Sequence, residues 1–361
     1  MALTGNKGEW SEIYTLFKLL GEGKVHAGDE NMDRIKDIFY PIIMILRQEK
    51  DGCYNYVTHD KNIIIQTSEG QTLLTISVED FLREAESLLC EIKLHNSTFA
   101  ISKTETFMHK VHCSTLKAKS SDKTDIRIVL HDYRTKINTE MGFSIKSQLG
   151  GNSTLLNPGK TTNFKYKIVN ANLTDNDIEY INRINSKSKI LDKVNAIIEK
   201  GASLVFEKVD NDTFHDNLLM LDCHLPDIMA HLLVEKQLTR INSIKELTYR
   251  ISEANSLKYK PERAKSFYEF KIKQLLVAIA LGMMPATPWN GKYDANGGYL
   301  VVKNDGDIVC YHFFERNRIE DFLFCNTYLE GSSTTRYEYA SIVKENDGTL
   351  SFKLNLQIRL K

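Results

Sequence analysis

The chain has 361 residues, of which 42% are hydrophobic and 26% charged, and its formal net charge is zero. This length allows one large domain or two of moderate size. The lack of a long apolar run, of a basic N-terminal leader and of a net positive charge argues against a membrane span, a secretory signal and non-specific coating of nucleic acid.

The first predicted element is a helix over Gly8–Leu20. Apolar side chains recur along it at the three- and four-residue intervals of a helix with one buried face: Trp10, Ile13, Tyr14, Phe17 and Leu20. Glu9 and Glu12 are three residues apart and share a neighbouring face, so one or both could reach a site beside the helix. Acids in a first turn also complement the helix dipole.

A connector, several short strands and two helices are expected next. The connector begins at Arg34. Runs rich in β-branched residues predict three strands: Ile42–Arg47, Asn62–Thr67 and Thr72–Ile76. Ser77 is placed to cap a helix over Glu79–Lys93, and a further helix is expected over Glu105–Cys113.

Two strands joined by a polar turn are predicted within Thr124–Gly150. Apolar residues alternate with polar ones in both strands, which is the period of a half-buried strand: Ile126, Ile128 and Leu130, then Phe143 and Ile145. If these residues face the core, Asp125, Ser144 and Lys146 project together from the opposite face.

These three side chains are suited to magnesium-dependent cleavage of a phosphodiester. A carboxylate supplies an oxygen ligand to a hard metal, and a lysine positions the attacking water or stabilises charge on the phosphate. The spacing of Asp125 and Ser144-x-Lys146 resembles the PD-(D/E)xK nuclease signature. Thr124 stands in place of its proline, and Ser144 in place of its second acid. Asp132 is an alternative ligand, ranked below Asp125 because it lies nearer the turn.

The loop after this hairpin, over Gly150–Phe164, is rich in Gly, Asn, Ser and Thr. Amides, hydroxyls and basic groups contact phosphates and base edges, so we expect DNA contacts from five side chains: Gln148, Lys160, Asn163, Arg336 and Arg359. Arg359, in an apolar strand, could instead alternate into solvent. Between Ile101 and Asn170 there are 12 Lys or Arg residues against 5 Asp or Glu, a surplus that suits a polyanionic substrate.

The rest of the chain is predicted to be helical and then β. Helices are expected twice within Leu173–Gly201, as a bent pair around Pro226, and over Ser243–Asn255, Arg263–Leu281 and Asn317–Phe324. Strands are expected over Ser203–Val209 (in the sheet of the hairpin), Gly298–Val302 and Asp307–Phe314, with two more at the end. The six cysteines lack zinc-site spacing, so we expect free thiols and a cytoplasmic location.

Three longer phrases at the start, middle and end of the chain resemble the HpaII family of type II restriction endonucleases: Asn6–Leu20, Gly142–Tyr166 and Lys353–Leu360. The resemblance implies an α/β fold with a mixed central sheet flanked by helices. It implies sequence-specific double-strand cleavage of DNA with Mg²⁺, a homodimer at a palindrome, and CCGG as a target. Because Ser144 replaces an acid, it also implies a carboxylate imported from elsewhere, for which Glu9 is the first candidate and Glu12 the second.

We expect either one continuous domain or two. In the second case a catalytic core over residues 1–210 would precede a helical segment and C-terminal strands over 211–361 that complete the core and the DNA cleft. Two other functions fit the same residues: a DNA-binding protein of this fold without cleavage, and a structure-specific repair nuclease.

Overall fold

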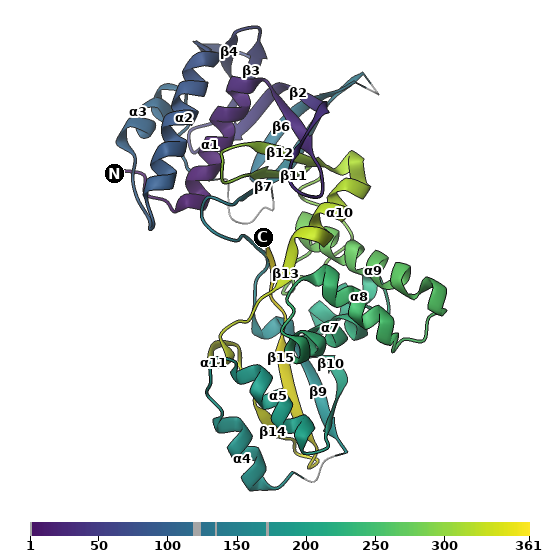
Figure 1. Cartoon of the computed structure of the whole chain (residues 1–361). Coiled ribbons are helices and arrows are strands. Elements are labelled where there is room, and N and C mark those ends of the chain that lie inside the picture. Colours follow the sequence, from purple (N-terminus) through teal and green to yellow (C-terminus); the bar gives the residue numbers. More distant parts are fainter. Residues whose placement is uncertain (1, 118–123, 134–135, 171–172) are drawn as a thin grey trace. The chain divides into compact units, whose positions relative to one another are not determined.

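The computed structural model describes residues 2–117, 124–133, 136–170 and 173–361, and it confirms the predicted α/β class (Figure 1). The chain divides into two units, each formed by two stretches of sequence. The first comprises Met1–Ser153 and Tyr293–Phe322, and the second Thr154–Lys292 and Leu323–Lys361. The expected boundary at residue 210 lies inside the second unit, and the chain returns to the first because two strands beyond Tyr293 pair into its sheet.

Within the described residues, the first unit contains a nine-stranded sheet in the order β1-β12-β11-β7-β6-β2-β3-β4-β5. Its strands are β1 (Lys24–Gly28), β2 (Arg34–Gln48), β3 (Cys53–His59), β4 (Asn62–Thr67), β5 (Thr72–Ser77), β6 (Ile126–Asp132), β7 (Ile137–Ser147), β11 (Gly298–Val302) and β12 (Ile308–His312). The pairs β1–β12 and β11–β7 are parallel and the other pairs antiparallel, so the sheet is mixed, as expected.

One expectation for this sheet was wrong. The segment from Arg34 to Pro41 was expected to be a connector, but it is the first half of β2 and pairs with β1. Pro41 is accommodated because it lies at the end of that pairing, opposite Lys24, where a missing N–H costs little.

Helices cover one face of the sheet. They are α1 (Lys7–Glu22), α2 (Val78–Leu94) and α3 (Ser102–Lys110), and their buried side chains form one core with the inward residues of the strands (Figure 1). A capping box between Asn6 and Glu9 sets the start of α1, and Ser77 caps α2 as predicted. A short 3₁₀ helix (Phe313–Glu315) leads into α10 (Arg316–Asn326).

The second unit holds two smaller sheets among the described residues, in the orders β10-β9-β15-β14 and β13-β16-β8. Their strands are β8 (Thr154–Leu156), β9 (Asn163–Val169), β10 (Ser203–Val209), β13 (Thr327–Leu329), β14 (Ile342–Lys344), β15 (Leu350–Asn355) and β16 (Ile358–Leu360). The helices are the 3₁₀ turn Lys160–Thr162, α4 (Asp175–Arg183), α5 (Lys189–Glu199), α6 (Asp212–Leu221), α7 (Leu225–Thr239), α8 (Ile244–Ala254), α9 (Pro261–Leu281) and α11 (Thr334–Tyr337).

The strand β10 was assigned to the wrong sheet. It was expected beside the hairpin β6–β7, but it pairs with β9 in the second unit, because the chain leaves the first unit after Ser153 and both strands follow that point. The strand β8 and the 3₁₀ turn also lie inside the stretch expected to be a loop. No helix in the described ranges is long and apolar enough to cross a membrane, and all six cysteines are free.

Candidate active site

The hairpin β6–β7 places Asp125 opposite Ser144. Ile126 pairs with Phe143, and the backbone N–H of Asp125 extends the ladder by donating to the Phe143 carbonyl at 2.9 Å. Ile126 and Phe143 are buried in the core beneath the helices. Because side chains alternate across a strand, Asp125, Ser144 and Lys146 share the opposite face, as the sequence predicted.

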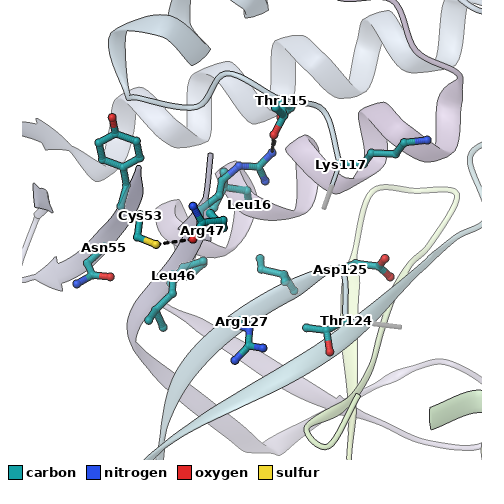
Figure 2. Close-up of a pocket in the computed structure, with 14 residues that line it drawn as sticks. Leu16, Leu46, Arg47, Cys53, Asn55, Thr115, Lys117, Thr124, Asp125 and Arg127 are labelled. Atoms are coloured by element: carbon teal, nitrogen blue, oxygen red, sulfur yellow. Dashed lines mark hydrogen bonds between the residues drawn. The ribbon is translucent and has the colours of Figure 1, made fainter. Parts of the chain in front are cut away.

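The carboxylate of Asp125 is held at one oxygen. Its Oδ2 accepts hydrogen bonds from the Ser144 hydroxyl at 3.0 Å and from the Ile145 backbone N–H at 2.6 Å. No side chain or backbone group among the described residues donates to Oδ1. One carboxylate oxygen is therefore fixed and the other is not, and Asp125 is among the residues that line a cavity of about 360 Å³ (Figure 2).

Lys146 lies two residues beyond Ser144 on β7 and is half-buried. Its Nζ is 5.5 Å from the ring centroid of Tyr299, which is buried on the neighbouring strand β11. Burial lowers the pKa of Lys146, and the negative charges of Asp125 and Glu12 oppose that shift.

Glu9, the first candidate for the imported carboxylate, has other partners. Its Oε2 accepts from the Asn6 backbone N–H at 2.9 Å in the capping box, and its Oε1 lies 2.7 Å from Lys117 Nζ. Burial by itself raises the pKa of Glu9, but the hydrogen bonds from Lys117 and Asn6 and the charge of Lys117 bring it below its usual value. Both carboxylate oxygens of Glu9 are therefore engaged within the first unit.

The donor set suits a hard divalent cation that keeps part of its water. Within the described residues, no three His, Cys, Asp or Glu side chains gather into a complete metal centre. Mg²⁺, however, is commonly bound by one or two carboxylates together with substrate phosphate and several waters. The Oδ1 of Asp125, which accepts from no donor among the described residues, is an oxygen ligand of this kind.

A buried ion pair near the cavity was not anticipated from the sequence. Arg47 and Glu49 form a salt bridge in which the Glu49 side chain is fully buried. Glu49 Oε2 also accepts from the hydroxyls of Ser114 at 2.7 Å and Thr115 at 2.8 Å, and Arg47 donates to the Thr115 carbonyl. Ser114 and Thr115 lie more than sixty positions after Glu49 in the chain, so no local pattern could have indicated this network.

The five predicted DNA contacts are divided between the units. Gln148 belongs to the first unit, where its Oε1 accepts from the Asn304 backbone N–H at 3.3 Å. The other four lie in the second unit. Lys160 forms an exposed ion pair with Glu338, and Arg336 is exposed over the Tyr337 ring.

Asn163 and Arg359 are engaged inside the second unit. Asn163 is only 2% exposed, and its amide bonds to the Tyr337 carbonyl at 2.8 Å and to Asn355 at 2.7 Å. This placement does not support the expected DNA contact by Asn163. Arg359 forms an ion pair with Glu330. The two expectations for this residue were a side chain in solvent and a contact to DNA, and neither included this ion pair.

Comparison with known proteins covers almost the entire chain. Residues 6–360 match the HpaII restriction endonuclease family. The chain is 42% identical over 358 residues to the type II restriction enzyme HpaII of Haemophilus parainfluenzae. The matched region covers 99% of this chain and 98% of that protein. No solved structure matches the chain.

Proposed function

Because the chain belongs to the HpaII restriction endonuclease family and is a type II restriction endonuclease, we propose that Asp125, Lys146 and Glu12 form the centre at which it cuts DNA. The observation that carries this assignment is the hydrogen bonding of Asp125. One of its oxygens is fixed by two donors and the other is open, on the strand face that also carries Lys146.

The chemistry is hydrolysis of a backbone phosphodiester. Restriction endonucleases generally use a divalent metal ion, and we propose Mg²⁺, which would polarise the phosphate and favour ionisation of the attacking water. Asp125 and Glu12 would hold the ion, and the Ser144 hydroxyl would keep Asp125 oriented.

Lys146 would stabilise the negative charge on the phosphate or position the water. The water oxygen bonds to phosphorus, the bond from phosphorus to the 3′ oxygen breaks, and that oxygen receives a proton. The products are 5′-phosphate and 3′-hydroxyl ends.

We also propose a two-fold homodimer acting at CCGG in the cytoplasm. A palindrome presents the same sequence on both strands, so two copies related by a two-fold axis can each cut one strand. The 42% identical relative and its printed name support this choice of target. The six free cysteines are compatible with a reducing compartment.

A digest of sequenced DNA tests the function. Purified protein with phage DNA and Mg²⁺ should give discrete bands whose ends map to one short palindrome, and EDTA should abolish them. Asp125→Asn should remove the bands and leave the thermal unfolding midpoint near that of the wild type. Retarded but intact DNA would instead indicate a binder without cleavage, and a preference for branched substrates a repair nuclease.

A further inference from the structure

The cavity that Asp125 borders is also lined by three basic side chains, Arg47, Lys117 and Arg127. Lys117 and Asp125 both line it but come from different segments, as Figure 2 shows. The Lys117 side chain is 53% exposed, and one of its three ammonium protons is used by Glu9 Oε1 at 2.7 Å. The other donors remain available to a ligand that enters from solvent.

The position of Lys117 is set in advance by its partner. Glu9 cannot swing freely, since its second oxygen accepts the Asn6 backbone N–H at 2.9 Å within the capping box of α1. The hydrogen bond and charge of Glu9 raise the pKa of Lys117, so the ammonium group is charged at neutral pH. A fixed carboxylate therefore holds a permanently charged lysine at the cavity.

The chain just before Lys117 is anchored as well. Ser114 and Thr115 donate their hydroxyl hydrogens to Glu49, which is buried against Arg47. Breaking such a buried pair is costly, so this segment is held firmly against the sheet. A cation on an anchored segment loses little conformational entropy when it binds an anion.

Lys117 and Lys146 are placed to contact different phosphates of the DNA. Lys146 lies on β7 two residues beyond Ser144, which hydrogen-bonds Asp125, whereas Lys117 donates to Glu9 Oε1 at 2.7 Å. Lys146 therefore belongs with the phosphate at Asp125, and Lys117 is free to take another group of the same polyanion.

We propose that Lys117 binds a backbone phosphate of the DNA that flanks the phosphate being cut, and that Glu9 is its positioning residue. This inference rests on the proposed function, because it takes the cut to occur at Asp125. It also gives Glu9 a role different from metal binding.

The test is the salt dependence of DNA binding. Wild type, Lys117→Ala and Lys117→Gln are titrated with a target duplex in Ca²⁺, which supports binding without turnover, over a series of salt concentrations. Loss of one phosphate contact should reduce the slope of log K against log salt by about 0.9. Lys117→Arg should restore most of the slope, because it keeps the charge.

Lys103 supplies the matched control. It is an exposed lysine of the same unit on α3, hydrogen-bonded to Ser87 at 3.2 Å, and it does not line the cavity. Lys103→Ala should keep the wild-type slope. A Lys117→Ala slope equal to that of Lys103→Ala would overturn the proposal.

The two proposals fail separately. Asp125→Asn should lose cleavage while retaining the wild-type salt slope. If Asp125→Asn cuts normally, the proposed catalytic centre is wrong whatever Lys117 does. If Asp125→Asn is inactive and Lys117→Gln binds with the wild-type slope, only the role of Lys117 is wrong.

Discussion

The Ser144 hydroxyl donates a 3.0 Å hydrogen bond to Asp125 Oδ2 across the antiparallel pair β6–β7. This serine therefore acts on Asp125 by orienting its carboxylate. Together with the Ile145 backbone N–H at 2.6 Å, it fixes one carboxylate oxygen and leaves the other for a ligand.

Removing this donor should slow cleavage without weakening DNA binding. In Ser144→Ala the backbone N–H of Ile145 still holds Asp125, so we expect a loss of about 10-fold in the single-turnover rate, equivalent to about 1.4 kcal/mol. Duplex affinity in Ca²⁺ should stay at the wild-type value. An unchanged single-turnover rate would show that the hydroxyl does not position Asp125. Ser144→Thr is the matched control, because it keeps the hydroxyl.

Replacing Lys146 should make the protein more stable and inactive. Burial lowers the pKa of Lys146, which means that the folded protein disfavours its charged form. Lys146→Met keeps the aliphatic stem and removes the charge, so the free energy of unfolding should rise by on the order of 1 kcal/mol. Urea unfolding measures this, with Lys103→Met as an exposed control. A less stable, fully active variant would contradict both the energetic argument and the assigned role.

Glu12 and Glu9 should separate in their response to magnesium. Glu12→Gln should raise the Mg²⁺ concentration for half-maximal cleavage and reduce the rate roughly 100-fold, an effect of the size seen when a group that orients a metal site is lost. Glu9→Gln should leave the Mg²⁺ requirement unchanged and weaken DNA binding through Lys117. Its amide oxygen can still accept the Asn6 N–H of the capping box, so the free energy of unfolding should change little. The opposite pattern in a Mg²⁺ titration would restore Glu9 as the ligand.

Neutralising Glu49 should destabilise the first unit strongly. Its side chain is fully buried against Arg47, so Glu49→Gln leaves an uncompensated buried guanidinium and should cost about 3 kcal/mol in unfolding free energy. Glu179→Gln, which breaks the exposed pair with Arg183, should cost at most about 0.5 kcal/mol. Equal midpoints for the two variants in urea would argue against a buried charge pair.

Lys236 should make stability depend on pH in the alkaline range. Burial lowers its pKa to about 8 from an ordinary 10.5, opposed by the charge of Glu330. Between these values the unfolded chain binds more protons than the folded protein, so this group makes stability rise with pH.

Lys236→Met should therefore be more stable than the wild type near pH 7, with an advantage that shrinks between pH 8 and 10.5. Urea midpoints across that range check the sign. An advantage that grows with pH would mean that the pKa of Lys236 is raised rather than lowered.

Local patterns were sufficient for most helices and strands. The strands β4 (Asn62–Thr67) and β10 (Ser203–Val209) have the predicted limits, and the predicted capping residue Ser77 is found where its helix begins. Periodicity and capping depend on neighbours a few residues away, which is why a single sequence reveals them. The alternation in the hairpin likewise placed Asp125 and Lys146 on one face.

Pairings between distant segments could not be read in this way. The parallel partner of β7 is β11, about 150 residues later, and β10 proved to belong to another sheet because its partner β9 lies in the second unit. An alternating pattern predicts that a segment forms a β-strand, but it does not predict with which other strand the segment pairs.

The sequence alone indicated the family, the α/β class and the shared face of Asp125, Ser144 and Lys146 on the hairpin, because motif spacing and the two-residue period of a strand are local properties. The contacts of Glu9 with Asn6 and Lys117, the burial of Asn163 and the network around Glu49 required the folded chain. Each depends on hydrogen bonds and charges contributed by residues far away in sequence. The helical period predicts that Glu9 and Glu12 lie on neighbouring faces, but it does not predict which of them a distant segment will contact.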